Sequence, residues 1–313
     1  MRRKQLGNSE LKVSVVALGT WPMGGTTYGY VDDNESIATI RQAVDSGINL
    51  IDTAPGYGNG RAESVVGKAI KGRRDQVIIA TKVGLVPTPQ GVRRLLKPES
   101  IRREIEDSLR RLDVDTIDLY QIHWPDYTTP IEDSVAELIK LHEEGKYRYL
   151  GVSNFSIELM EKVQDMTNLV SLQPQYSLLN RDIEAEVLPY CIKNNIGILS
   201  YGSLGAGILA GKYHEKPNFA KDDTRYGFYP YFREPMWSKA MHLVAVLRNI
   251  AEENNKPVAH IAINWLTQQP GVTTALVGAR HPHQAAENAT AGSWQLRNEE
   301  LALIDQTYQQ IFD

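Results

Sequence analysis

Short apolar runs alternate with segments of helical spacing along almost the whole chain, and this alternation most constrains its fold. The segment that carries Ile101, Ile105 and Leu109, for example, repeats apolar residues at the three- to four-residue spacing of a helix. Strands that alternate with helices predict a parallel sheet. The candidate strands are residues 13–18, 48–52, 77–81, 117–122, 149–152, 170–173, 196–200 and 274–277.

About eight strand–helix units suit a closed (β/α)8 barrel, and an open, doubly wound sheet is the alternative. No Gly-x-Gly-x-x-Gly follows the first strand, as a dinucleotide-binding open sheet requires, and this favours the barrel. No linker or low-complexity segment divides the chain, so we expect one barrel domain over residues 1–313. A Gly-Asn turn within residues 4–12 predicts an N-terminal β-hairpin, and surplus helical patterns predict extra helices near the C-terminus.

Charge and composition argue against several classes of partner. The formal net charge is -4 and the pI is about 6.0, so neither nucleic acid nor an anionic membrane is expected to bind. No apolar run is long enough to span a bilayer, and the N-terminus lacks the apolar core of a signal peptide. Cys191 is the only cysteine, so no intrachain disulfide can form. We therefore expect a cytoplasmic protein, monomeric by default.

Polar residues stand at the ends of three successive candidate strands. Asp52 ends the second strand, Lys82 follows the third and His123 follows the fourth, while Tyr57 lies in the loop after Asp52. Barrel strands end on one common face and lie about 4.8 Å apart, so these side chains can share a pocket. Each of them alone is more often structural, because Asp52 could cap a turn and Tyr57 could pack on the barrel rim.

Together, these four residues predict a proton donor for a carbonyl oxygen. A free tyrosine has a pKa of about 10, and a neighbouring lysine ammonium lowers that pKa. We expect Asp52 to hold Lys82 in place, Lys82 to lower the pKa of Tyr57, and Tyr57 to give its proton to the oxygen. A neutral His123 would orient the same oxygen through a hydrogen bond.

Five motifs, in their order along the chain, resemble those of the aldo-keto reductase superfamily. They are Asp52-Thr53-Ala54 with Tyr57-Gly58 and Glu63, Thr81-Lys82, Leu119-Tyr120-Gln121-Ile122-His123, Gly151-Val152-Ser153-Asn154-Phe155, and Gln173-Pro174-Gln175-Tyr176-Ser177-Leu178-Leu179-Asn180-Arg181. The resemblance covers nearly the whole chain, and the ordered set is far more specific than any one fragment. It implies a (β/α)8 barrel, reduction of aldehydes or ketones, a nicotinamide cofactor, and the same catalytic roles for the tetrad Asp52, Tyr57, Lys82 and His123.

The resemblance also implies where the cofactor would bind. Ser153, Asn154 and Gln173 would contact the nicotinamide carboxamide, and Tyr201 would stack on the nicotinamide ring. Small residues near Gly205 would let backbone N–H groups approach the pyrophosphate. The expected contacts in this part of the site are Gly19, Thr20, Trp21, Asp52, Ser153, Asn154, Gln173, Tyr201, Gly202, Ser203, Leu204, Gly205, Gly207 and Lys212.

Residues 278–288 resemble the final cofactor motif of the family but depart from it in composition. Many members carry Lys-Ser at its start and Arg six positions after that Lys, whereas this chain has Gly-Ala and Gln. Arg280 would replace the missing cation on the 2′-phosphate of NADPH. The pattern resembles the branch that includes bacterial general-stress reductases and potassium-channel β subunits, so NADP(H) is expected and NAD(H) is the less favoured alternative. The expected contacts are Gly278, Ala279, Arg280, Gln284, Glu287 and Asn288.

Trp21, Tyr57 and Trp124 are the expected walls of a pocket for a small-molecule aldehyde or ketone. The aromatic segment 211–237 is too long for an unstructured loop, so it folds over the cofactor, completes the pocket or packs as a surface loop. We expect a polar loop at residues 87–97. Its basic residues, Arg93, Arg94 and Lys97, either favour an anionic substrate or are simply solvated.

Two other functions fit the same fold. A cofactor-sensing regulatory subunit would bind the cofactor with little turnover, as the resemblance to potassium-channel β subunits allows. A metal-dependent barrel hydrolase would need a cluster of ligands, but no His-x-His stands at the end of a barrel strand. The triplet His281-Pro282-His283 falls within the cofactor motif, so we expect no metal. Turnover of a model aldehyde tests the first alternative, and metal analysis tests the second.

Overall fold

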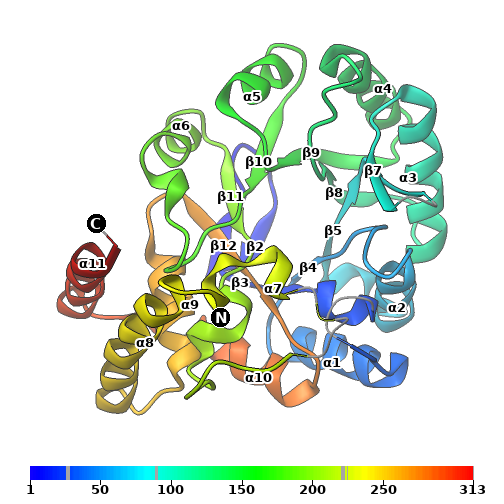
Figure 1. Cartoon of the computed structure of the whole chain (residues 1–313). Coiled ribbons are helices and arrows are strands. Elements are labelled where there is room, and N and C mark those ends of the chain that lie inside the picture. The colour runs from blue at the N-terminus through cyan, green and yellow to red at the C-terminus, as the bar shows by residue number, and fades with distance from the viewer. Residues whose placement is uncertain (26–28, 89–90, 220–222, 224, 313) are drawn as a thin grey trace.

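The computed structural model describes residues 1–25, 29–88, 91–219, 223 and 225–312. Within them, parallel strands form a closed barrel (Figure 1). In order around the ring the strands are β3 (Val16–Gly19), β4 (Leu50–Asp52), β5 (Ile78–Val83), β8 (Ile117–Ile122), β9 (Tyr147–Ser153), β10 (Leu169–Gln173), β11 (Gly197–Ser200) and β12 (Val272–Gly278). The ring closes where β12 pairs with β3, with Ala275 opposite Val16. The predicted (β/α)8 barrel is confirmed.

Helices surround the barrel and connect successive strands (Figure 1). They are α1 (Asp33–Asp45), α2 (Arg61–Ile70), α3 (Pro98–Leu112), α4 (Ile131–Glu143), α5 (Ile157–Gln164), α6 (Val187–Lys193), α8 (Met236–Glu253), α9 (Val258–Gln268), α10 (Pro282–Ala291) and α11 (Asn298–Phe312). Helices α8 and α11 are additional to the repeating units and pack on each other, which confirms the extra helices expected near the C-terminus. No helix in the described part of the chain is long and apolar enough to cross a membrane.

A two-stranded hairpin closes the barrel at the amino ends of its strands. Strands β1 (Arg3–Gln5) and β2 (Lys12–Ser14) pair antiparallel, as the sequence predicted. The hairpin buries Leu6, Leu11 and Val13 against side chains that point into the barrel, such as those of Leu50 and Leu119. These apolar side chains fill the interior of the barrel at this end, and active sites of such barrels lie at the opposite, carboxyl end of the strands.

The apolar run at residues 13–18 is two strands and not one, so that part of the sequence interpretation was wrong. The chain turns a corner between β2 and β3, where Ser14 Oγ donates to the Val16 carbonyl at 2.7 Å. The Ser14 amide donates to Asn49 Oδ1, also at 2.7 Å. These side-chain hydrogen bonds replace those of a continuing strand, and an unbroken apolar pattern does not reveal such a corner.

A second hairpin stands where the sequence predicted a polar loop. Strands β6 (Leu85–Thr88) and β7 (Gly91–Arg94) pair antiparallel, with Leu85 opposite Arg94 and Val86 opposite Arg93. The turn between them, residues 89–90, lies outside the described residues. Charged residues obscured the strand pattern, because β7 is exposed along its length and β6 is only partly buried.

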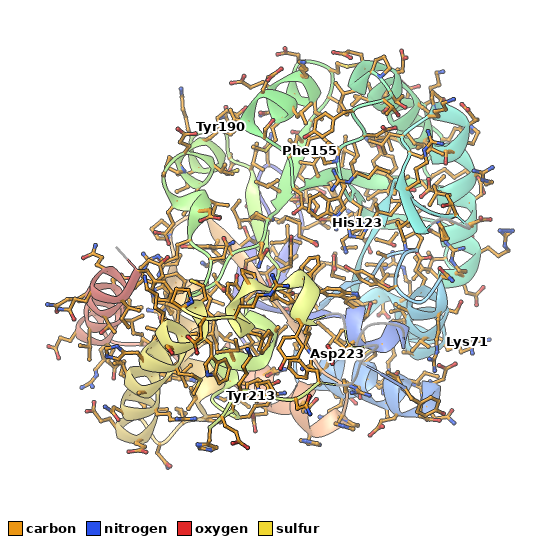
Figure 2. The ribbon with its side chains drawn as sticks, in the orientation of Figure 1. Lys71, His123, Phe155, Tyr190, Tyr213 and Asp223 are labelled. Atoms are coloured by element: carbon orange, nitrogen blue, oxygen red, sulfur yellow. The ribbon has the colours of Figure 1, made fainter. Side chains whose placement is uncertain are left out.

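The aromatic segment 211–237 forms short helices, with its aromatic rings packed together. Helix α7 (Arg225–Phe228) and the 3₁₀ turn η5 (Pro230–Phe232) lie between β11 and α8 along the chain. Phe219 contacts Phe232 edge to face, with ring centroids 5.0 Å apart. Figure 2 shows Tyr213 and Asp223 of this segment on the same side of the barrel, far from Tyr190. Residues 220–222 and 224 lie outside the described residues.

Glu104 of α3 is a buried carboxyl group whose protonation is expected to affect stability. Its Oε2 accepts a hydrogen bond from the Gly84 amide at 3.0 Å, and Oε1 accepts one from Ser100 Oγ at 3.1 Å. Burial raises its pKa from 4.5 to about 7 despite these two hydrogen bonds, which lower the pKa. The neutral carboxyl is therefore favoured in the folded protein. The stability that it contributes is complete below pH 4.5 and is lost as the pH rises through 7.

Glu104→Gln mimics the neutral carboxyl. We expect its stability relative to the wild type to be greater at pH 8 than at pH 5. The expected gain is on the order of 2 kcal/mol, measured by urea unfolding at both pH values. Glu161→Gln on α5 is the control, because Glu161 is exposed and its replacement should have the same effect at both pH values. An equal effect of Glu104→Gln at both pH values would contradict the prediction.

Candidate active site

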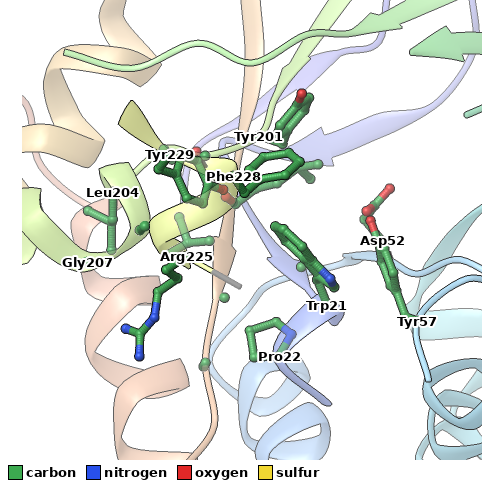
Figure 3. Close-up of a pocket in the computed structure, with 18 of the residues that line it drawn as sticks. Trp21, Pro22, Asp52, Tyr57, Tyr201, Leu204, Gly207, Arg225, Phe228 and Tyr229 are labelled. Atoms are coloured by element: carbon green, nitrogen blue, oxygen red, sulfur yellow. Dashed lines mark hydrogen bonds between the residues drawn. The ribbon is translucent and has the colours of Figure 1, made fainter. Parts of the chain in front are cut away.

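A cavity of about 570 Å³ opens at the carboxyl ends of the barrel strands (Figure 3). It is bounded by the catalytic candidates at one end and by the start of α10 at the other. Most of the residues that the sequence analysis selected line it: Gly19, Trp21, Asp52, Tyr57, His123, Trp124, Ser153, Asn154, Gln173, Tyr201, Gly202, Ser203, Leu204, Gly207, Lys212, Gly278, Ala279, Arg280, Gln284, Glu287 and Asn288.

Three of the selected residues do not line the cavity. Thr20 is buried behind it, where its Oγ1 donates to the Asp52 carbonyl at 2.9 Å. Lys82 is fully buried. It does not line the cavity itself, but it contacts residues that do. Gly205 faces Leu179, because a Cβ atom on Gly205 would lie 2.7 Å from Leu179 Cδ1. These residues support the wall of the cavity.

The carboxylate, the ammonium and the phenol of the predicted tetrad lie in hydrogen-bond contact. Lys82 Nζ donates to Asp52 Oδ1 at 2.6 Å and to the Thr53 carbonyl at 3.0 Å. The same ammonium donates to the Tyr57 hydroxyl at 3.2 Å. Burial lowers the pKa of Lys82, but Asp52 and Tyr57 outweigh burial, so its pKa is raised and the lysine stays charged.

Close backbone contact between two loops positions Tyr57. Gly24 ends the 3₁₀ helix η1 (Trp21–Gly24) and touches the chain at Gly58, where a Cβ atom on Gly58 would lie 2.1 Å from the Gly24 carbonyl oxygen. Gly58 also has a φ of 65°, which favours glycine. Trp21 then stacks on Tyr57, with ring centroids 6.3 Å apart. The loop after β3 thus packs against both the backbone and the ring of the loop that carries Tyr57.

The pKa of Tyr57 moves in the direction opposite to that expected from the sequence. Burial has the largest effect and raises the pKa above 10, and the Asp52 carboxylate adds to this increase. The Lys82 ammonium lowers the pKa, as predicted, but does not outweigh burial. The expectation of a lowered pKa was wrong because the depth of burial could not be seen in the sequence. The phenol is therefore protonated at neutral pH and available as a donor.

His123 faces Tyr57 from the end of β8, with ring centroids 5.9 Å apart in an edge-on arrangement. Figure 2 shows His123 near the middle of the molecule. Burial lowers its pKa well below the ordinary value, and the nearby Lys82 ammonium lowers the pKa further. The imidazole is therefore neutral at pH 7 and can donate one hydrogen bond.

Polar residues next to the tetrad form a second set of contacts. Asn154 has a φ of 60°, and its Nδ2 donates to the His123 carbonyl at 3.1 Å and to Ser153 Oγ at 3.0 Å. Its Oδ1 accepts a hydrogen bond from the Tyr201 hydroxyl at 3.0 Å. Gln173 Nε2 donates to Asp52 Oδ2 at 2.8 Å. The residues expected to contact a carboxamide are therefore connected to the tetrad.

The other end of the cavity gathers positive charge. Lys212, Arg225 and Arg280 all line it, and after burial, the charges of Arg225 and Arg280 lower the pKa of Lys212 further. Asp223 pairs with Arg225 at 2.6 Å and offsets one of these charges. Gly207 has a φ of 97°, and a Cβ atom there would lie 3.1 Å from Lys212 Cε. A side chain at this position would press against Lys212, so glycine keeps the backbone and the lysine accessible to an anionic group.

The family of the chain follows from comparison with known sequences. The model of the aldo/keto reductase family matches residues 15–309. This chain belongs to the aldo/keto reductase family. Among curated relatives, it is 43% identical to the aldo-keto reductase YhdN of Bacillus subtilis, over 96% of this chain and 91% of that protein.

Other relatives of this aldo/keto reductase carry different names. It is 34% identical to the NADH-specific methylglyoxal reductase of Escherichia coli, over 97% of each chain. It is 32% identical to a probable voltage-gated potassium channel subunit beta of Oryza sativa, over 93% of this chain and 91% of that protein. The branch suggested by the sequence is therefore confirmed.

Solved structures support the same fold for this aldo/keto reductase. The glycerol dehydrogenase of Gluconobacter oxydans has a TM-score of 0.91 at 42% identity, and the match covers 99% of this chain and 96% of that chain. An aldo/keto reductase from Klebsiella pneumoniae, in complex with NADP and acetate, has a TM-score of 0.79 at 29% identity, covering 98% and 96%.

Sequence reasoning missed Gln121, and it left the contribution of the aromatic segment open. Gln121 of β8 donates to Asp52 Oδ2 at 3.2 Å and accepts from Gln173 at the same distance, so it helps to orient the carboxylate. A polar residue inside an apolar strand was the available signal. Phe228 and Tyr229 also line the cavity, and Phe228 contacts Trp21 edge to face at 5.4 Å (Figure 3). The aromatic segment therefore completes the cavity wall, which was one of the alternatives expected from the sequence.

Proposed function

We propose that the protein reduces small aldehydes and ketones to alcohols with NADP(H). The observation that carries this proposal is the buried chain of contacts from Asp52 through Lys82 to Tyr57, whose phenol lines the cavity. Membership of the aldo/keto reductase family supports the reaction class. Two relatives are named for methylglyoxal and glycerol, which supports a small substrate.

Different residues of the chain have different roles in the proposed reaction. NADPH, when bound, would supply the hydride that the carbonyl carbon accepts. The electron pair of the C=O π bond moves onto the oxygen, and Tyr57 donates its phenolic proton there, which gives the alcohol. The Lys82 ammonium, 3.2 Å from the phenol oxygen, stabilises the phenolate that remains. A neutral His123 orients the carbonyl oxygen through a hydrogen bond.

The cavity fits a nicotinamide dinucleotide. Ser153, Asn154 and Gln173 offer donors and acceptors for a carboxamide beside the tetrad, and Tyr201 offers an aromatic face next to them. Gly207 lacks a side chain and lines the cavity beside Lys212, which suits a pyrophosphate that approaches the backbone. The far end of the cavity, near α10, suits the adenosine.

The positive end of the cavity supports NADP(H) over NAD(H). Arg280 would hold the 2′-phosphate, and Lys212 and Arg225 add to the positive potential. We expect Arg280→Ala to raise the KM for NADPH about 30-fold, equal to about 2 kcal/mol, and to leave the KM for NADH almost unchanged. Steady-state kinetics with both cofactors measure this. An equal change for both cofactors would count against Arg280 as the phosphate contact.

Turnover of a panel of aldehydes and ketones tests the proposed reaction. With NADPH or NADH in excess, absorbance of the reduced cofactor should fall continuously in the presence of a substrate. A single stoichiometric oxidation without further turnover would instead support a cofactor-sensing subunit, the role suggested by the named potassium-channel relative. No oxidation with any carbonyl compound would overturn the proposed function.

A further inference from the structure

We propose that the β6–β7 hairpin selects substrates that carry a carboxylate at the end remote from the carbonyl, and that Arg94 binds this carboxylate. The inference rests on the proposed carbonyl reduction and names a substrate class for the same site. It follows from the position of the hairpin, from the contact between Arg94 and a cavity wall, and from the charge around Arg94.

The register of the hairpin places Arg94 on the side of the cavity. Leu85 and Val92 both line the cavity. Arg94 pairs directly with Leu85 across the hairpin and lies two residues after Val92 in the same strand. Residues in either relation share one face of a β-ribbon, so Arg94 faces the cavity side and Arg93 faces the opposite side.

Arg94 also contacts a wall of the cavity. Its guanidinium lies over the Trp124 ring, 4.5 Å from the ring centroid. Trp124 lines the cavity and directly follows His123 in the chain. Stacking on an indole restricts a guanidinium and leaves its N–H edge able to bind a planar carboxylate with two hydrogen bonds. The positive charge is therefore held at the substrate end of the cavity.

Arg94 has no acidic partner among the described residues. Residues 84–98 contain no Asp or Glu, and Arg94 forms no ion pair in the described part of the chain. The nearby Asp126 accepts hydrogen bonds from the Leu96 amide at 3.0 Å and from Thr128 and Thr129. Arg94 is exposed, and its charge is available to an incoming anion.

The shape of the substrate follows from the residues between the two ends. Tyr57 and His123 mark the position of the carbonyl, Leu85 and Val92 provide an apolar wall, and Arg94 stands at the rim. A substrate that contacts all of them has a carbonyl group, an apolar body and a distal carboxylate. 4-Carboxybenzaldehyde has these parts, and its methyl ester differs from it only by the loss of the charge.

The test compares kcat/KM for these two compounds at saturating NADPH. We expect Arg94→Gln to lower kcat/KM for the acid about 10-fold, through KM, and to change the value for the ester less than about 2-fold. Arg94→Lys keeps the charge and should retain much of the preference for the acid. Arg93→Gln is the matched control on the opposite face of the hairpin. It should leave the ratio of kcat/KM for the acid to kcat/KM for the ester within about 2-fold of the wild-type ratio.

Each possible result either supports or overturns the role of Arg94. A fall in the acid-to-ester ratio in Arg94→Gln alone supports the proposal, as does a weaker preference for the acid at high salt. An unchanged ratio in Arg94→Gln, or an equal fall in Arg93→Gln, overturns it. If the wild type reduces neither compound nor any other carbonyl, the proposed function fails. Reduction of both compounds with an unaltered ratio removes only the role of Arg94.

Discussion

Tyr57→Phe is expected to lower kcat by about 10²- to 10⁴-fold, the range for loss of a general acid. In the proposed mechanism the phenol donates its proton to the carbonyl oxygen; it lines the cavity, and its hydroxyl contacts the Lys82 ammonium at 3.2 Å. The ring stacked on Trp21 remains in the variant, so the fold and the affinity for NADPH should be retained. Steady-state turnover, cofactor titration by fluorescence and thermal unfolding measure the three quantities.

The matched control for this variant is Tyr127→Phe. Tyr127 is exposed and does not line the cavity, so loss of its hydroxyl should leave kcat within about 2-fold. If Tyr57→Phe folds, binds NADPH and turns over at the wild-type rate, Tyr57 is not the acid. Turnover that falls together with cofactor binding would also count against the assignment, because the phenol would then serve binding.

Lys82→Met is expected to have the largest effect on stability. Lys82 and Asp52 are 0% and 2% exposed, and their charged groups lie 2.6 Å apart. Removal of one partner leaves a buried carboxylate without its counter-ion, which costs about 3–5 kcal/mol. Turnover should also fall at least about 100-fold, because the phenolate loses its stabilising charge. Urea unfolding and turnover measure the two effects.

The double variant Asp52→Asn with Lys82→Met separates stability from catalysis. Neither residue of the pair is then charged, so much of the lost stability should return. Turnover should stay low, because no ammonium faces Tyr57. A double variant that recovers its activity together with its stability would show that Lys82 acts only as a structural ion-pair partner.

The positions of the barrel strands were predictable because each unit of a parallel barrel carries its own local pattern. That Asp52 and His123 line one cavity was predictable for the same reason: strand ends converge whatever the details of the loops between them. The residues that the pattern located correctly are those whose location is set by the end of a strand alone. The burial and the contacts of their side chains could not be predicted in this way.

The remaining features depend on packing that no local pattern encodes. The net effect on the pKa of Tyr57 is a competition between burial and Lys82, and only the structure shows that burial has the larger effect. In the sequence, Gln121 is one polar residue in an apolar strand. Only the structure shows that it donates a hydrogen bond to Asp52. The aromatic segment contributes Phe228 to the cavity wall through contacts with Trp21, a residue distant in sequence.

Because β3 pairs with β12, the ring cannot close on a ribosome until nearly all of this chain has emerged. Before that point, β3 and β11 each present an unpaired edge, and such edges are templates for wrong pairing. The nascent polypeptide must therefore keep its earliest barrel strand available while the later strands are synthesised. Folding is committed only when the two distant strands meet, so chaperone dependence should be greatest just before β12 leaves the exit tunnel.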